Sequence, residues 1–301
     1  MTFVNALSLV HLNPNASPSD TASPSTTIGP PLATPSSASG VASPDRFAPS
    51  LSASQWIPLA QVATSTFHIS EGSVYAGDLQ ILNADAASFM VSSANTGDIL
   101  DFAKDKTYVF DTQGGIYAGI DSGSFAVLNF SSTSGRYAKD KEHAYWFTWQ
   151  DWGIVTEADP GTFTTNERVL PFARDKSRVF YEGLVLANAD PETFMSIPLS
   201  NFAKDKNHVY YYGGGFLYPT VVQGADPNTF FPFPPTGGGA FASATTESLY
   251  GEDDKNIYCT DSVLVGADIT SFVPNPNTFG GASDKYHTYW DCAVYLPGTS
   301  P

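Results

Sequence analysis

The sequence predicts an all-β protein built from seven similar hairpin units. Three observations carry this prediction: a hairpin motif that recurs along the chain, a second motif between its copies, and a composition with 14% aromatic and only 15% charged residues. Self-similarity at a regular spacing is typical of repeat architectures, in which neighbouring units bury a core together. We expect the units to form a β-propeller-like closed ring, and an open, curved array of β-hairpins is the alternative.

The hairpin motif starts with an aromatic and a small residue, has Asp three positions after the aromatic residue, and has a second aromatic residue five positions after that Asp. Six copies contain this residue, called the hairpin Asp below: Asp105, Asp140, Asp175, Asp205, Asp253 and Asp284. A seventh copy has Ser70 instead, and the last copy starts with Gly281 rather than an aromatic residue. Turn-forming residues follow each Asp, and β-branched and aromatic residues follow the turn, as strands prefer. Each copy is therefore predicted to be a hairpin, and its small residue allows neighbouring units to pack closely.

A connection motif lies between the hairpins, with Asp followed four positions later by Phe and with Ser or Thr just before the Phe. Its Asp residues, called the connection Asp below, are Asp85, Asp121, Asp159, Asp190, Asp226 and Asp268. Pro follows the Asp in three copies, which is typical of a capped helical turn. We expect each Asp to cap its turn rather than to bind Ca²⁺, and each Phe to fill the core.

The chain divides at about residue 53. Residues 1–53 are mostly Ser, Thr, Pro, Ala and Gly, a composition that predicts a disordered linker. Residues 54–301 form the predicted β-repeat domain. Within this domain, residues 55–60 are expected to complete the last unit and so close the ring, and residues 232–246 are expected to form a surface loop.

Net charge restricts the partners of the protein. With Asp+Glu 30 against Lys+Arg 14, the net charge is -16, which disfavours nucleic acid and anionic lipid as partners. No apolar run approaches the roughly 20 residues that span a bilayer. The segment 1–12 lacks Lys and Arg and is a poor secretory signal. We nevertheless expect an extracytoplasmic or cell-surface protein, because the linker is of the kind that holds a folded domain away from an anchor.

The two cysteines, Cys259 and Cys292, lie in the last two units. An even number in neighbouring units favours a disulfide, which would contribute about 3–4 kcal/mol by the chain-entropy model. Two buried free thiols are the alternative, and the sequence does not decide between them.

Clustered aromatic residues are the candidate ligand-binding residues. Trp146, Trp149 and Trp152 fall within seven positions, and Tyr212 and Tyr218 belong to a weaker second cluster. Alternating strand residues face opposite sides, so some of these rings are expected to point outward and to suit a glycan or protein ligand. Core packing between covered sheets explains the same residues, and this alternative stays open.

Residues 202–212 read Phe-Ala-Lys-Asp-Lys-Asn-His-Val-Tyr-Tyr-Tyr, and residues 224–230 read Gly-Ala-Asp-Pro-Asn-Thr-Phe. This combination resembles the bacterial DKNYY repeat family, and weaker copies extend the resemblance over roughly residues 65–295. The resemblance implies a bacterial repeat protein, often linked to the cell envelope, and it carries no established activity.

Motifs of the common enzyme classes are missing from the sequence: it has no Gly-rich phosphate loop, nucleophile elbow, metalloprotease helix or four-cysteine zinc pattern. We therefore expect a monomeric, non-enzymatic, surface-associated module that binds a protein or a glycan and needs no cofactor or metal. A hydrolase of extracellular polymers with acidic residues on one rim is one alternative. A purely structural spacer is the other.

Overall fold

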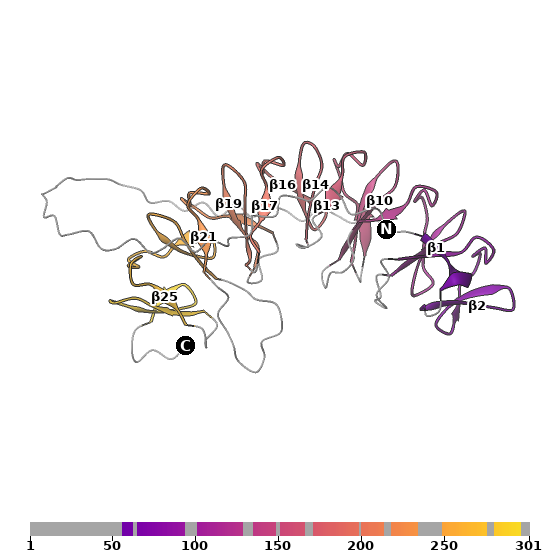
Figure 1. The fold of residues 1–301 in the computed structure, drawn as a ribbon, viewed down its shortest axis with the longest axis horizontal. Helices are drawn as coiled ribbons and strands as arrows, with labels where there is room; N and C mark the ends of the chain where they lie inside the picture. The colour runs from indigo at the N-terminus through magenta and orange to yellow at the C-terminus, as the bar shows by residue number, and fades with distance from the viewer. Residues whose placement is uncertain are drawn as a thin grey trace, which may run out of the picture. The chain divides into compact units, whose positions relative to one another are not determined.

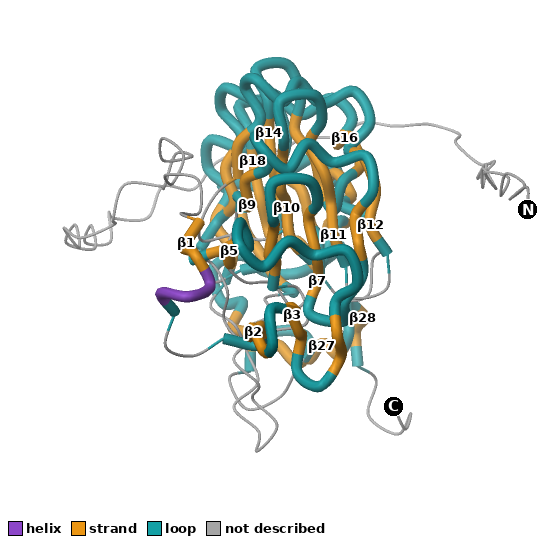
Figure 2. Tube along the Cα trace, turned by 90° about the vertical axis from the view of Figure 1, so that its right-hand side faces the viewer, coloured by secondary structure: helices purple, strands orange, loops and turns teal. Residues whose placement is uncertain are grey.

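The computed structural model describes residues 56–62, 65–93, 101–128, 135–148, 151–165, 171–198, 200–213, 218–233, 249–275 and 280–295. The predicted linker at 1–53 and most of the predicted loop at 232–246 lie outside these residues. The described chain consists of strands and turns, with one 3-10 turn, η1 (Leu59–Gln61), next to the first strand (Figure 2). The all-β prediction is confirmed. In the described part of the chain, no helix has the length and apolar character needed to cross a membrane.

Seven antiparallel sheets follow one another along the chain (Figure 1). The first sheet contains β2 (Phe67–Ser70), β3 (Ser73–Ala76) and β4 (Leu79–Gln80). The second contains β1 (Trp56–Pro58), β5 (Met90–Ser92), β6 (Phe102–Lys104), β7 (Val109–Asp111) and β8 (Ile116–Tyr117). The third contains β9 (Ala126–Val127), β10 (Arg136–Lys139), β11 (Ala144–Phe147) and β12 (Trp152–Ile154).

The remaining four sheets have four strands each. The fourth contains β13 (Thr164–Thr165), β14 (Phe172–Arg174), β15 (Val179–Tyr181) and β16 (Leu184–Leu186). The fifth contains β17 (Met195–Ser196), β18 (Phe202–Lys204), β19 (Val209–Tyr211) and β20 (Thr220–Val221). The sixth contains β21 (Phe231–Pro232), β22 (Tyr250–Glu252), β23 (Ile257–Cys259) and β24 (Ser262–Val263). The seventh contains β25 (Val273–Pro274), β26 (Gly281–Ser283), β27 (Thr288–Trp290) and β28 (Ala293–Val294).

Each hairpin motif forms a two-stranded hairpin, as predicted, and in the five four-stranded sheets these are the two central strands. In the fourth sheet, β14 and β15 pair with Ala173 opposite Phe180. The strand that follows the preceding connection Phe lies on one side of this hairpin, and a short edge strand lies on the other. The connection motif therefore links each sheet to the next one.

The prediction that residues 55–60 complete the last unit is wrong. Strand β1 pairs antiparallel with β5, with Ile57 opposite Val91, and so forms an edge of the second sheet. The last sheet takes its four strands from residues 273–294. Among the described strands, no ladder joins the first sheet to the last.

The connection Phe residues fill the space between successive sheets, as predicted. Phe163, for example, is buried and lies 5.5 Å from the Tyr137 ring of one sheet and 5.4 Å from the Phe180 ring of the next, measured between ring centroids. All six are buried: Phe89, Phe125, Phe163, Phe194, Phe230 and Phe272. A Phe in each interface excludes water from both neighbouring sheets, so burial of these rings joins the units into one stack.

The small residue of the hairpin motif is needed for this packing. Ala103, Ala138, Ala173 and Ala203 are fully buried. Gly251 occupies the same position in the sixth sheet, where an added Cβ would lie only 2.3 Å from the ring of Phe230. A larger side chain at this position would push the connection Phe out of its place.

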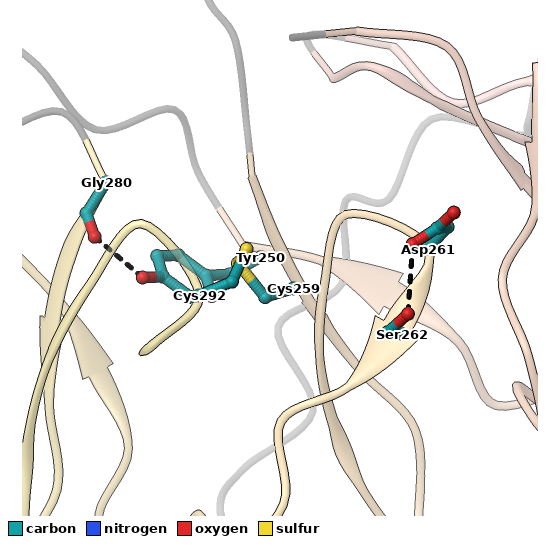
Figure 3. Close-up of a disulfide and its surroundings, with 6 residues drawn as sticks. All are labelled: Tyr250, Cys259, Asp261, Ser262, Gly280 and Cys292. Atoms are coloured by element: carbon teal, nitrogen blue, oxygen red, sulfur yellow. Dashed lines mark hydrogen bonds between the residues drawn. A yellow bond between two sulfur atoms is a disulfide. The ribbon is translucent and has the colours of Figure 1, made fainter. Parts of the chain in front are cut away.

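A disulfide joins the last two sheets: Cys259 of β23 bonds to Cys292 of the β27–β28 turn, 33 residues later (Figure 3). The hydroxyl of Tyr250 also links these sheets by donating to the carbonyl oxygen of Gly280 at 2.7 Å (Figure 3). The seventh sheet is therefore held to the sixth by a covalent bond in addition to packing.

Reduction of this disulfide is expected to lower the free energy of unfolding by about 3–4 kcal/mol, because opening a loop of this length restores entropy to the unfolded chain. Urea unfolding with and without reductant measures the effect. The double variant with Cys259→Ser and Cys292→Ser should unfold at a lower urea concentration than the oxidised parent protein, with or without reductant. Equal unfolding midpoints for the reduced and oxidised parent protein would contradict the prediction.

Candidate functional site

A carboxylate clamp centred on the hairpin Asp connects successive units. In the third sheet, Oδ1 of Asp140 accepts hydrogen bonds from the backbone N–H groups of Glu142 at 2.8 Å and His143 at 2.7 Å, which hold its own turn. Its Oδ2 accepts from the N–H of Asp121 in the preceding connection at 2.9 Å and from the hydroxyl of Tyr145 at 2.7 Å. One buried carboxylate thus holds a hairpin turn and the connection that precedes it.

The clamp recurs at every hairpin Asp. Oδ2 accepts from the N–H of the preceding connection Asp at 2.8–3.0 Å in the pairs Asp85–Asp105, Asp159–Asp175, Asp190–Asp205, Asp226–Asp253 and Asp268–Asp284. Tyr210, Tyr258 and Tyr289 repeat the hydroxyl contact of Tyr145. The Asp and the Tyr of the repeated motif therefore have a shared structural role.

The Lys that follows the hairpin Asp contacts the same connection. Lys141 forms an ion pair with Asp121 at 2.9 Å, and its backbone N–H donates to the hydroxyl of Ser124 at 2.9 Å. Equivalent ion pairs join Lys106 to Asp85, Lys176 to Asp159, Lys206 to Asp190 and Lys285 to Asp268. These pairs are exposed, so they orient the connection more than they stabilise it. Within the described residues, no group of three metal-ligating side chains lies together.

A basic residue before the hairpin Asp holds the connection that follows. Nζ of Lys139 donates to the carbonyl oxygens of Pro160 at 2.9 Å and Phe163 at 3.0 Å. Lys104, Arg174 and Lys204 make the same kind of contact with Ser122, Pro191 and Pro227. Each of these connections is thereby bound from both of its neighbouring hairpins.

The first and last hairpins depart from the motif. The first has Ser70 in place of the hairpin Asp. The last has Gly281 and Ser283 in place of the aromatic and basic residues of the second to fifth units, whereas in the sixth unit Glu252 already replaces the basic residue.

Because of the clamp, we expect the free energy of unfolding to decrease at acid pH. Burial raises the pKa of Asp284, but hydrogen bonds from the Asp268 N–H and the Tyr289 hydroxyl outweigh burial and lower this pKa to about 2. The same balance lowers the pKa values of Asp140 and Asp253. Because an unfolded Asp has a pKa of about 4, the folded state binds fewer protons below that pH. We expect stability to be complete above about pH 4 and to fall from there toward pH 2.

Urea unfolding at several pH values between 2 and 6 measures this loss. Asp284→Asn, which cannot titrate, should show a smaller dependence on pH. A parent protein whose unfolding midpoint stays constant from pH 6 to pH 2 would contradict the role assigned to the clamp.

A surface groove of about 310 Å³ lies between the third and fourth sheets. Its lining comes from β11–β12 of one sheet and from the β15–β16 turn of the next, and consists of Trp146, Thr148, Asp151, Trp152, Gly153, Ile154, Glu182, Gly183 and Leu184. Leu184 is an exposed large apolar side chain beside the carboxylates of Asp151 and Glu182. The side chains of Trp152 and Ile154 are also exposed and share the face of Phe147 and Tyr145. The groove therefore offers apolar surface next to negative charge.

The structure brings two of the three predicted tryptophans together in this groove, in different environments. Trp146 is only 9% exposed and packs on Tyr137 with 4.4 Å between ring centroids, so it belongs to the core and only borders the groove. Trp152 is 36% exposed, and its ring stacks on Phe147 at 5.7 Å and lies 5.3 Å from the ring of Tyr117 in the second sheet, so the ring borders the groove from the side of the second sheet. Trp149 lies outside the described residues.

Tyr212 and Tyr218 do not line the groove. They are half-buried, and their hydroxyls donate to the carbonyl oxygens of Ser200 and Val185. Both rings pack against the core between the fourth and fifth sheets, where Tyr212 lies 5.0 Å from Phe172 between centroids. Their contacts are those of packing residues.

Sequence reasoning missed the residues on the opposite side of the groove. Glu182 and Gly183 both have positive φ, 47° and 82°, and form the two-residue turn between β15 and β16. The N–H of Gly183 donates to the hydroxyl of Tyr137 at 2.9 Å, and an added Cβ would lie 2.9 Å from the Cβ of Trp146. Burial raises the pKa of Glu182. The Glu-Gly pair between two apolar runs could have predicted this turn, but nothing in the sequence predicts that the turn packs against Trp146.

The fold and the repeated clamp define a class of all-β repeat protein in which each hairpin is fastened to the connections beside it. The sequence model of the DKNYY family matches residues 67–214, in agreement with the resemblance. The clamps at Asp253 and Asp284 continue the same pattern beyond the matched residues. No match was found among the curated proteins or among the solved structures.

Proposed function

We propose that the protein is a non-enzymatic, surface-associated module that binds another protein or a glycan through the groove between the third and fourth sheets. The observation that carries this proposal is a groove with two carboxylates and the exposed side chain of Leu184, bordered by the strand that carries the exposed side chains of Trp152 and Ile154. Large apolar side chains gathered on a surface are typical of interaction sites, and Trp offers a rigid ring to either class of ligand.

The disulfide supports an extracytoplasmic location, because such bonds persist in oxidising compartments. The net charge of -16 supports a partner that is neither nucleic acid nor an anionic membrane. The protein acts as a monomer in this proposal.

An open array of units fits the end motifs better than a closed ring. In a ring, the first hairpin would follow a connection and would profit from an Asp at position 70. Likewise, the last hairpin would precede a connection and would profit from an aromatic residue at 281 and a basic residue at 283. The sequence has Ser70, Gly281 and Ser283, which supports an open array.

Trp152→Ala is expected to reduce binding at least about fivefold, because the variant removes the large exposed ring at the border of the groove. Binding is measured on an array of glycans and of cell-surface proteins, followed by titration of the strongest ligand. Thermal unfolding of the variant shows whether it remains folded, and Leu184→Ala provides a second groove variant.

Phe231→Ala is the matched control, because Phe231 is an exposed aromatic residue of the sixth sheet, outside the groove. It should bind as the parent protein does. Equal binding by the Trp152 variant, the Leu184 variant and this control would remove the groove from the proposal, and absence of any ligand would favour a structural spacer.

A hydrolase is the second candidate, favoured by one observation: Asp151 and Glu182 line the same groove, and burial raises the pKa of Glu182, as a general acid requires. Incubation with labelled polysaccharides and peptidoglycan tests this activity. Turnover that disappears in both Asp151→Asn and Glu182→Gln would support the hydrolase over the binding module.

A further inference from the structure

Strand β12 presents a free backbone edge beside the groove. In the ladder with β11, the N–H of Thr148 donates to the carbonyl of Asp151 and the N–H of Val155 donates to the carbonyl of Ala144, both at 2.8 Å. Hydrogen-bonded and non-hydrogen-bonded pairs alternate in antiparallel ladders. The backbone polar groups of Trp152 and Ile154 therefore point away from β11, toward the open side of the sheet.

Three of these four outward groups are available. The N–H of Trp152 donates to Oδ1 of Asp151 at 2.7 Å. The structure describes no partner for the N–H of Ile154 or for the carbonyl groups of Trp152 and Ile154. An unpaired edge of this kind is a template for an added strand.

Other described edge strands are either less exposed than β12 or only two residues long. Among the described edge strands of three or more residues, β12 is the only one exposed along its whole length. In the neighbouring β16, the carbonyl of Val185 already accepts the hydroxyl of Tyr218. The edge of β12 therefore combines accessibility with free hydrogen-bonding groups.

We propose that an extended, basic polypeptide segment adds to β12 as a further strand, which makes the partner a protein and rests on the binding function proposed above. Because side chains of a strand alternate between faces, its apolar side chains lie beside Trp152 and Ile154 on one face, and its Lys or Arg side chains lie near Asp151 and Glu182 on the other face. Charge complementarity selects this occupant, since the groove contains two carboxylates, its described lining contains no Lys or Arg, and the chain has a net charge of -16.

Three seven-residue peptides test the proposal against the full chain by calorimetric titration. The first alternates Lys and Val, the second replaces Lys by Glu, and the third carries N-methyl groups on alternate residues of the Lys-Val sequence. The Lys-Val peptide is expected to bind at least about tenfold more tightly than either of the others, because only it provides both charge and backbone donors. If the methylated peptide binds as tightly as the Lys-Val peptide, strand addition is overturned, independently of the results for the protein variants described next.

Ile154→Pro removes the outward N–H without removing a bond to β11, a position where edge strands tolerate Pro. It is expected to weaken the Lys-Val peptide about fivefold or more. Val294→Pro is the matched control, because Val294 faces Tyr289 in the last sheet as Ile154 faces Tyr145 in the third. Glu182→Gln should weaken the Lys-Val peptide about threefold and leave the Glu-Val peptide no weaker. Equal binding by the two Pro variants would overturn the proposal.

A glycan ligand gives a distinguishable result. If a glycan binds the parent protein, is lost in Trp152→Ala and is unaffected by Ile154→Pro, the groove keeps its binding function and strand addition is overturned. If neither peptide nor glycan depends on Trp152, both the proposed function and this inference fail.

Discussion

Replacement of Asp140 by Ala is expected to lower the free energy of unfolding by about 3 kcal/mol or more, because several buried donors lose their acceptor at once. The carboxylate accepts three backbone N–H groups and the hydroxyl of Tyr145, and the side chain is almost completely buried. Urea unfolding followed by circular dichroism measures the loss. Asp140→Asn should cause an intermediate loss of unfolding free energy. Its amide keeps one oxygen that can accept hydrogen bonds, but its NH₂ group would face N–H and O–H donors.

Lys141→Ala is the control in the same turn. Lys141 pairs with Asp121 at the surface, so its removal should change stability far less than removal of Asp140. Equal destabilisation by the two variants would show that the motif stabilises the protein through its surface ion pair, and the buried clamp would lose its assigned importance.

Phe230→Ala is expected to cost about 3–5 kcal/mol, the range for deletion of a buried aromatic ring. Phe230 is 1% exposed and lies between Phe202 of the fifth sheet and Tyr258 of the sixth, at 5.1 and 5.9 Å between centroids. Its removal leaves a cavity between two sheets that the small residue at 251 cannot fill. Thermal and urea unfolding report the effect.

Phe231→Ala provides an internal comparison one residue later. Phe231 is 61% exposed, so its truncation should change stability by less than about 1 kcal/mol. A larger loss for Phe231 than for Phe230 would mean that the sheet register is shifted by one residue, and the account of the core would then be wrong.

The repeated hairpins and the buried connection Phe were predictable because their signals are local. An Asp-led turn between β-branched and aromatic runs specifies a hairpin within ten residues, and a Phe at a fixed place in every unit indicates a core position. The clamp itself was not predictable. Asp140 and Asp121 each had a sufficient local role as turn former and cap, and nothing in one sequence shows that the carboxylate of one reaches the N–H of the other, 19 residues away.

The tryptophan cluster was interpreted with only partial success. Alternation along a strand predicts one outward face only when one face of the sheet meets water. The third sheet has a neighbour on each side, so Trp146 is covered by the turn at Gly183, and Trp152 stays accessible because β12 is an edge strand. The groove depends on the position of that turn, which the sequence of the third unit does not contain.

The wrong prediction for the strand β1 has a similar cause. Residues 56–58 were assigned to the last unit by analogy with the strand that follows each connection Phe, and their length and composition suit any sheet edge. Their partner, β5, is set by contacts such as the bond from Nε1 of Trp56 to the carbonyl of Phe125 at 3.0 Å and the packing of the Trp56 ring on Phe125. Such contacts join residues 69 positions apart.

Because the connections that start at Asp159, Asp190 and Asp226 are fastened to the hairpins on their two sides, we expect the chain to tolerate the gain or loss of one internal repeat there. Duplication of a segment such as residues 172–201 would bring its own Asp, basic residue and Phe, and would meet the same surfaces that already exist on both sides. The two outermost repeats do not have this freedom, since their motifs no longer match a neighbour. Evolution by gene-internal duplication would therefore vary the length of this protein from its middle and leave its ends in place.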